Sequence, residues 1–563
     1  MLWGIPPGLL LITGALLVPF LAGKWRKTYM TVLPLAGLWA LVGADAGTFY
    51  TFSFFTYEIV PVRIDGLSLV FGYIFHIAAA LSVIYAWHND DIVEQVAGLA
   101  YAGSGIGALF AGDLITLFVY WEAMAVTSVF LIWTRRTDAS YRAGMRYLII
   151  QVGSGVLLLS GAILMAQQTG SIAFEKMTLG SLATWLILIA FGIKCAFPFL
   201  HNWLQDAYPE ATVTGTVFLS AFTTKCAVYA LARGFPGTEL LIYVGAAMTA
   251  FPIFYAVIEN DLRRVLAYSL NNQLGFMVVG VGIGSALAIN GAAAHAFAHI
   301  LYKALLFMSM GAVLYRVGTI KGSELGGLYK SMPFTAVFCI VGAASISAFP
   351  LFSGFIAKSL TLSAVAHEGY FAVWLILLFA SAGVFHHSGI KIPYFAFFSH
   401  DSGIRCKEAP LNMLIAMGIT AFLCIAIGVY SPWLYSLLPY EVDYVPYTAS
   451  HVIGQYQLLM FSALAFAVLM RFKIYPPELK SVNLDFDITY RKWLPALYKW
   501  TINVTRDGWE CILLDLKGGV HRFIDYMFRH HGPEGILART WPTGSMALWV
   551  AVLLATFLLI YYV

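Results

Sequence analysis

Apolar runs long enough to cross a lipid bilayer follow one another through most of this sequence. A transmembrane helix needs roughly 20 mostly apolar residues, so such runs restrict the chain to a bundle of membrane helices. The composition agrees, because 60% of the 563 residues are hydrophobic and only 11% are charged. The sequence therefore predicts an all-α polytopic membrane protein.

The runs predict about sixteen transmembrane helices. Their expected ranges are 3–22, 28–45, 65–87, 94–112, 114–133, 141–167, 182–200, 212–234, 239–258, 263–284, 290–317, 333–363, 371–397, 411–430, 453–471 and 543–563. The first run has no positively charged start and no small-residue cleavage site, so we expect it to be a retained helix and not a signal peptide.

Two of these expected helices contain helix-breaking residues beside a lysine. Pro198 follows Lys194 in the seventh, and Pro350 and Gly354 precede Lys358 in the twelfth. A break leaves backbone carbonyls unpaired, which is tolerated at membrane depth where protein or a hydrated cavity satisfies them. We therefore predict two broken helices.

Two regions differ from the apolar runs. Residues 47–64 alternate apolar and polar side chains, which predicts an extracytoplasmic hairpin. Residues 476–542 place aromatic and aliphatic residues among charged ones at helical intervals, which predicts an amphipathic lateral helix followed by an anchoring span at 543–563. The pattern leaves open whether this helix rests on lipid headgroups or packs along neighbouring subunits.

Arginine and lysine gather in the loops after odd-numbered spans, for example at Lys24, Arg135, Arg263 and Arg405. Because cytoplasmic loops carry the excess of positive charge, this bias predicts a cell-membrane protein with its N-terminus outside. The lateral helix is then expected on the cytoplasmic side.

Ionisable side chains inside the apolar runs are the candidate functional residues. A charge at membrane depth costs roughly 2.5–3.5 kcal/mol or more, so such residues usually pair or line a polar path. The residues concerned are Glu122, Lys194, Lys225, His295, His299, Lys303 and Lys358. We interpret them as a proton relay.

Spacing and chemistry support that interpretation. His295, His299 and Lys303 are four residues apart and share one helix face, and histidine can both donate and accept a proton near neutral pH. A carboxylate that moves relative to a buried ammonium changes its hold on the proton, so Glu122 and Lys194 are expected to form a gate.

Two further positions have more than one interpretation. Lys391, near His386 and His387, either extends the relay or snorkels to the cytoplasmic face. Asp113, at the start of its span, is expected to be a helix-end residue or a salt-bridge partner.

Other chemistries find little support in the sequence. The six cysteines contain no C-x-x-C pair, so we expect no metal site, no cofactor and no disulfide framework. The net charge of +4 is spread through loops, so we expect no nucleic-acid binding. No catalytic residue is predicted in this chain.

Several segments carry a resemblance to a known family. They are GDLITLFVYWEAMAVTS, GIKCAFPFLHNWLQDAYPEATVTGTVFLSAFTTK, RRVLAYSLNNQLGFM, AAAHAFAHILYKALLFMSMGAVL and GAASISAFPLFSGFIAKS. Over residues 65–400 they resemble, in order, the proton-translocating, antiporter-like subunits shared by respiratory complex I and the multisubunit (Mrp-type) Na+/H+ antiporters. The resemblance implies no bound cofactor, and as partners other membrane subunits, the lipid bilayer and H+, with Na+ as an exchanged ion in one version.

Applied residue by residue, the resemblance makes Glu122 the family's membrane glutamate and Lys194 and Lys358 the lysines of the two broken helices. Lys225 becomes the bridging lysine, and His295, His299 and Lys303 the central connection. The implied division is 1–112 for N-terminal helices, 113–400 for the ion-translocating core, 401–475 for further helices, 476–542 for the lateral helix and 543–563 for the anchor.

This sequence departs from the family pattern at two positions. Gln273 stands where many relatives have a histidine, so that step either runs through water or is absent. Gln205 replaces the proline of W-L-P-D-A, which predicts a less stiff loop after the first broken helix.

Alternative functions stay open at this point. The C-terminal layout is similar to the distal subunit of complex I, whereas RRVLAYSLNNQLGFM is more similar to Mrp-type complexes. A membrane hydrogenase, a redox protein with haem on His295 and His299, and a non-conducting scaffold for a peripheral partner are the other candidates. Haem is disfavoured because both histidines lie on one predicted helix.

Overall fold

The structure is a computed structural model that describes residues 5–476, 478–479, 483–540 and 542–562. It divides into two compact units, Met1–Asn483 and Leu484–Val563. Parts of the expected spans 3–22 and 543–563 and of the expected lateral segment 476–542 lie outside the described residues, namely 3–4, 477, 480–482, 541 and 563.

The first unit begins with helices near the predicted positions, although the first helix is shorter than expected and the second lies four to five residues earlier in the chain. They are α1 (Pro7–Ala15), η1 (Val18–Phe20), α2 (Gly23–Leu41), α3 (Gly66–Tyr85), α4 (Ile92–Phe110), α5 (Leu114–Trp133) and α6 (Asp138–Thr169). Side chains of Asp65, Asp91, Asp113 and Thr137 accept backbone N–H hydrogen bonds at the starts of α3 to α6. These caps satisfy donors that a helix start leaves unpaired.

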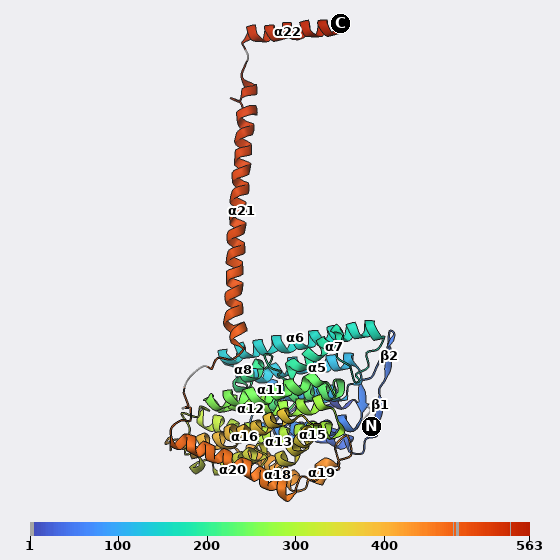
Figure 1. Ribbon diagram of the computed structural model, residues 1–563, viewed down its shortest axis with the longest axis vertical. Helices are drawn as coiled ribbons and strands as arrows, with labels where there is room; N and C mark the ends of the chain where they lie inside the picture. Colours follow the sequence, from blue (N-terminus) through green and yellow to red (C-terminus); the bar gives the residue numbers. More distant parts are fainter. Residues whose placement is uncertain (1–4, 477, 480–482, 541, 563) are drawn as a thin grey trace. The chain divides into compact units, whose positions relative to one another are not determined.

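The alternating segment between α2 and α3 forms strands, as predicted. The outer strands β1 (Gly47–Phe49) and β4 (Val62–Ile64) pair antiparallel, and the inner strands β2 (Phe52–Phe54) and β3 (Tyr57–Ile59) pair within them. Figure 1 shows them at one end of the helix bundle.

Both predicted broken helices are present. One consists of α7 (Leu182–Lys194) and α8 (Asn202–Ala207), and the other of α14 (Pro333–Ile346) and α15 (Ser353–His367). Each break contains the sequence Ala-Phe-Pro and two residues with positive φ: Ala196 at 61° and Phe199 at 69°, Ala348 at 57° and Leu351 at 74°. This left-handed geometry is costly for residues other than glycine, so the surrounding packing must hold it.

Two further interruptions were not predicted. The expected span 212–234 divides at Phe222 into α9 (Gly215–Ala221) and α10 (Thr223–Gly234). The expected span 371–397 is α16 (Phe371–Val384), the π-helical turn η4 (Phe385–Ile390), α17 (Lys391–Pro393) and the π-helical turn η5 (Tyr394–Phe398). Single π-helical turns are frequent at functional sites.

The remaining elements complete the first unit. They are η2 (Tyr208–Glu210), α11 (Glu239–Ile258), α12 (Leu262–Ile283), α13 (Ala286–Val317), η3 (Leu328–Lys330), α18 (Leu411–Val429), α19 (Ser431–Tyr435) and α20 (Ala449–Arg471). Helix α13 packs against α12, α14, α15, α18, α3 and α9, and it is buried along most of its length. The helices of this unit lie side by side in Figure 1.

Ten helices of the described residues are long and apolar enough to cross a membrane. Three shorter apolar helices join them, at Pro7–Phe20, Leu182–Lys194 and Pro333–Ile346. The polytopic helical membrane fold is therefore as predicted, whereas the expected number of sixteen spans is not confirmed. The breaks shorten some of the expected spans into half-helices.

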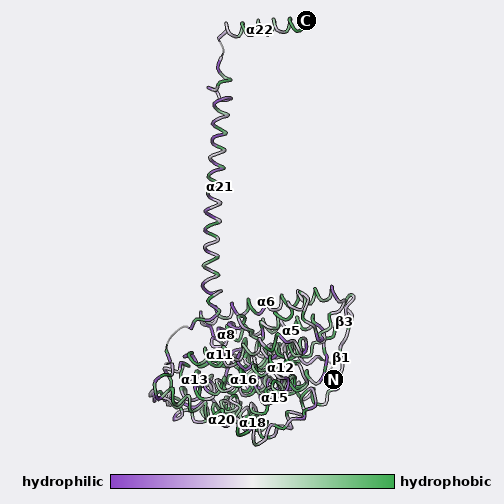
Figure 2. The backbone as a smooth tube through the Cα atoms, in the orientation of Figure 1, coloured by the Kyte–Doolittle hydropathy of each residue, from purple (hydrophilic) through white to green (hydrophobic). Residues whose placement is uncertain are grey.

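The second unit is helical and contains one long amphipathic helix, as predicted. It consists of η6 (Thr489–Trp493), α21 (Leu494–His531), η7 (Ile536–Ala538) and α22 (Thr543–Tyr562). Hydrophilic and hydrophobic residues alternate along α21 (Figure 2). None of the residues of α21 or α22 is buried within the chain, so their apolar side chains are available to lipid or to another protein.

Helices α11 and α12 pack at backbone contact through two glycines. A Cβ on Gly275 would lie 2.6 Å from the Gly245 carbonyl oxygen and 2.6 Å from the Thr249 nitrogen. Such close approach of small residues is typical of helix pairs in membranes. Gly153, in contrast, has nothing within 4 Å of its Cβ position.

We predict that Gly275→Ala lowers the midpoint of thermal unfolding in detergent by an amount equivalent to about 1–3 kcal/mol, because the methyl group forces two backbones apart. Gly153→Ala is the matched control and should leave the midpoint unchanged. Tryptophan fluorescence during heating measures both, and equal midpoints for the two variants would contradict the close packing.

Candidate functional site

Glu122 on α5 and Lys194 at the end of α7 form the first part of the candidate site. The Lys194 ammonium is fully buried, donates to the Trp121 carbonyl oxygen at 2.6 Å and lies 4.7 Å from the centre of the Trp121 ring. Lys194 is the charged group that acts on Glu122, although Glu122 Oε1 has no hydrogen-bond partner among the described residues. The predicted pair is therefore adjacent but not locked together.

The Glu122 carboxylate occupies space that a glycine on α6 leaves open. A Cβ on Gly155 would overlap Glu122 Oε1. That oxygen is buried and has no hydrogen-bond partner among the described residues. Any larger residue at position 155 would displace the carboxylate.

Lys225 lies just after the unpredicted break at Phe222. Its ammonium is fully buried and donates to the Ser220 carbonyl oxygen at 2.5 Å, in the last turn of α9. The C-terminal turn of a helix has unpaired carbonyls and a partial negative charge. The break therefore supplies an acceptor for this ammonium.

Lys358 uses the same arrangement at the second broken helix. Its ammonium donates to the carbonyl oxygen of Ile346, the last residue of α14, at 2.7 Å. It also lies 5.3 Å from the Phe276 ring centre, and that ring lies 5.6 Å from the ring of His295. Gly354, in the first turn of α15, allows this geometry because a Cβ there would overlap the Ser345 carbonyl oxygen.

The predicted central residues share a buried face of α13. His295 Nε2 lies 3.0 Å from the Tyr302 hydroxyl and 3.1 Å from Gln273 Oε1, and the same hydroxyl donates to Gln273 Oε1 at 3.1 Å. Gln273 thus takes part in a hydrogen-bonded triad. Tyr302 was missed, although it lies seven residues after His295 and the helical spacing could have identified it.

His299 and Lys303 differ from the other candidate residues in their hydrogen bonding. Both ring nitrogens of His299 and the Lys303 ammonium are buried, and none has a hydrogen-bond partner among the described residues. The His299 ring packs edge-on against Tyr302 at 5.3 Å, and the Lys303 nitrogen lies 6.0 Å from the Phe307 ring centre. Buried polar groups of this kind need water to satisfy them.

Electrostatic interactions show which of the candidate residues lie close to one another. The charges of Lys225, Lys303 and Lys358 all act on His299. Lys194 lies within electrostatic reach of Glu122 and of Cys226, the residue after Lys225, and Lys225 lies within reach of Cys195, the residue after Lys194. The candidate residues therefore form a pair, Glu122 and Lys194, and a central cluster around His299. Lys194 and Lys225 lie where the pair meets the cluster.

Lys391 is buried and does not snorkel, so that interpretation was wrong. Its ammonium donates to the carbonyl oxygens of Ala256, Val257 and Glu259 at 3.2, 2.7 and 2.7 Å, at the end of α11. The free carbonyls of that helix end satisfy the ammonium, so it has no need to reach bulk water.

Lys391 is also connected to the central cluster through its neighbours. His387 Nδ1 lies 2.9 Å from the Ser388 hydroxyl, which donates to the Ser269 hydroxyl at 2.7 Å. The charges of Lys303, Lys358 and Lys391 all act on His387. The serines were missed because nothing in their spacing relates residue 269 to residue 388.

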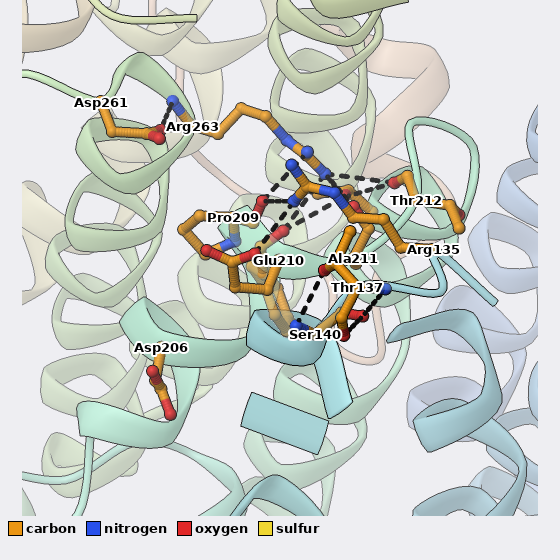
Figure 3. A network of polar contacts seen from close by, with 12 residues as sticks. Arg135, Thr137, Ser140, Asp206, Pro209, Glu210, Ala211, Thr212, Asp261 and Arg263 are labelled. Carbon is orange, nitrogen blue, oxygen red and sulfur yellow. Dashed lines mark hydrogen bonds and ion pairs between the residues drawn. The ribbon is translucent and has the colours of Figure 1, made fainter. Parts of the chain in front are cut away.

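The segment after the first broken helix is held by arginines, as Figure 3 shows. Arg263 is buried and donates to the carbonyl oxygens of Tyr208, Pro209, Ala211 and Thr212 at 3.1–3.2 Å. Arg135 donates to the Pro209 carbonyl at 2.7 Å and to Glu210 at 3.2 Å.

The expected loose loop at Gln205 is corrected by this geometry. Gln205 lies within helix α8, and Arg146 binds both carboxylate oxygens of the adjacent Asp206 at 2.6 and 3.0 Å. Helical hydrogen bonds and arginine contacts replace the stiffness that a proline would supply.

Two remaining predictions have clear structural positions. Asp113 caps α5, accepting from the backbone nitrogens of Ile115 and Thr116 at 2.9 and 2.8 Å, so it is the predicted helix-end residue. Pro198 and Pro350 lie in the two breaks, outside any helix. Both haem candidates, His295 and His299, come from α13 and do not face each other across two helices.

Comparisons with known proteins agree with this architecture. Residues 111–434 match the family model described as NADH:quinone oxidoreductase/Mrp antiporter, TM. The chain is 27% identical over 431 residues to hydrogenase-4 component B of Escherichia coli, covering 68% of this chain and 64% of that protein. It is 32% identical over 305 residues to a Na(+)/H(+) antiporter subunit of Alkalihalophilus pseudofirmus, covering 50% and 62%.

A solved structure shows a similar fold. The Mrp complex from Dietzia sp. matches with a TM-score of 0.77 and 23% identity, covering 92% of this chain and 62% of the matched chain. The chain spans less than two thirds of the length of the curated relatives named above.

We predict that Gly155→Ala and Glu122→Ala are coupled. The methyl group of Gly155→Ala clashes with Glu122 Oε1 in the wild-type background, whereas it has room once the carboxylate is removed. Gly155→Ala should therefore lower the unfolding midpoint in the wild type and have a smaller effect in Glu122→Ala, with a coupling free energy of about 1 kcal/mol or more. Additive effects would place the carboxylate elsewhere.

Proposed function

The chain belongs to the NADH:quinone oxidoreductase/Mrp antiporter family of membrane proteins, and we propose that it is the proton-translocating subunit of a multisubunit membrane complex. We propose an Mrp-type cation/proton antiporter as the assembly, with H+ moving through this chain in exchange for Na+. The N-terminus lies outside the cell in this proposal and the lateral helix α21 on the cytoplasmic side.

One observation carries the proposal. Lys194, Lys225, His299, Lys303, Lys358 and Lys391 are all fully buried in the protein, on five different elements. A single buried lysine is expensive, so a series of them with few carboxylate partners points to a function in ion transport. Amines and imidazoles within electrostatic reach of one another can pass a proton when single waters bridge them.

The geometry supports different roles for the residues of this series. Lys225 and Lys358 are bound to carbonyl oxygens, which stabilise the protonated form. His299 and Lys303 lie between them without protein acceptors among the described residues, so a proton there is held less firmly. In the proposal the charge passes from one carbonyl-bound lysine to the next through these two residues and water.

A second candidate function is favoured by a specific similarity. The match to hydrogenase-4 component B extends over 431 residues and covers 68% of this chain. In that alternative the same relay belongs to a complex I-like oxidoreductase or a membrane hydrogenase, and electron transfer in partner chains drives it.

We predict that Glu122→Gln and Lys225→Ala each reduce proton transport by the assembled complex by about tenfold or more, because each removes a group that holds the proton in transit. Lys321→Ala, which changes an exposed lysine, is the matched control. A pH-sensitive dye in vesicles measures the rate. Wild-type rates in both relay variants would favour a non-conducting scaffold.

The same vesicles separate the two candidate assemblies. Proton movement started by a sodium gradient alone supports the Mrp-type assembly. Movement that requires a redox substrate supports the complex I-like or hydrogenase assembly.

We predict a smaller effect for Tyr302→Phe, about threefold on the transport rate, because the His295–Gln273 contact remains after the hydroxyl is lost. A loss as large as that of Lys225→Ala would make the Tyr302 hydroxyl an obligatory proton carrier. An unchanged rate would place the triad outside the conducting path.

A further inference from the structure

The chain folds back over Lys391 after its last helix in the first unit. Residues 472–476 and 478–479 follow α20, and we call them the strap. The Tyr475 ring is buried and packs at 5.4 Å from His386, 5.3 Å from Phe466 and 6.3 Å from Phe395. The strap is thus anchored on the π-helical region that carries Lys391.

Glu478 of the strap is paired with the relay. Its Oε1 lies 3.0 Å from the Lys391 nitrogen, and the exposed fractions of the two side chains are 6% and 0%. Lys391 already binds three backbone carbonyls. The carboxylate therefore places an opposite charge beside an ammonium whose three N–H groups already have carbonyl acceptors.

Other charged groups surround this pair at the end of α11. Arg264 Nη1 lies 3.8 Å from Glu259 Oε2, and Asn483 donates to the same oxygen at 3.2 Å. Burial raises the pKa of the Glu478 carboxyl, and the Lys391 ammonium opposes the rise without cancelling it. The carboxyl therefore binds a proton more readily than an exposed glutamate does.

We propose that Glu478 is a positioning residue at the Lys391 end of the relay, and that the strap carrying it is a gate between Lys391 and bulk water. This inference rests on the proposed function. When the strap is closed, Glu478 holds Lys391; when it lifts, Lys391 exchanges its proton with water.

Three variants test the role of the carboxylate in transport. Glu478→Gln should reduce the rate about tenfold and move the pH dependence to lower pH, because Lys391 loses its negative partner while Glu259 and Arg264 stay in place. Glu478→Asp should keep most of the rate and the wild-type pH dependence. Glu441→Gln, on an exposed loop carboxylate, is the control for charge loss.

A reversible lock tests the gate itself. Tyr475→Cys and His386→Cys, in a background with Cys406→Ser and Cys511→Ser, place two thiols where ring centres are 5.4 Å apart. Linking them with a short bifunctional thiol reagent that dithiothreitol cleaves should abolish transport, and cleavage should restore it. The same protein before and after cleavage is its own control for folding and assembly.

The outcomes distinguish this inference from the proposed function. Transport that continues in the linked protein, or a Glu478→Gln variant with the wild-type rate and pH dependence, overturns the gate while Glu122→Gln and Lys225→Ala still report on the relay. Wild-type transport in those two relay variants overturns the proposed function instead.

Discussion

Three lysines of this protein are buried inside the helix bundle because helix ends bind their ammonium groups. Lys225 donates to the last turn of α9, Lys358 to the last residue of α14, and Lys391 to the end of α11. Each of these ends has carbonyls without helical partners and the negative side of the helix dipole. The interruptions are therefore not defects in the membrane helices, since they provide the polar groups that replace water around each charge.

Helix α13 does not offer such a helix end to its ionisable residues. It runs from Ala286 to Val317 without a break, so its interior carbonyls are occupied by helical hydrogen bonds. Lys303 and His299 lie within it and find no acceptor among the described residues. In the proposed relay, His299 and Lys303 are therefore the residues that hold a proton least firmly, whereas Lys225 and Lys358 are bound to carbonyl oxygens.

The sequence predicted those features that depend on local chemistry. The breaks at Pro198 and Pro350 were predictable because proline removes a backbone donor. The break at Phe222 was not, since it has neither proline nor glycine and depends on tertiary packing. Tyr302 was within reach of the helical spacing, whereas the pairing of Glu478 with Lys391 joins residues 87 positions apart and leaves no local signal.

The two ends of the series differ from its interior in the kind of partner they use. Lys194 lies near the carboxylate of Glu122, and Lys391 is paired with the carboxylate of Glu478. Lys225 and Lys358 are bound to backbone carbonyls without a carboxylate beside them among the described contacts. A carbonyl in a helix end is fixed in position, whereas a carboxylate on a flexible side chain can move and can itself take up a proton. In the proposed relay, control over when protons enter and leave therefore belongs to Glu122 and Glu478, the movable carboxylates at its two ends.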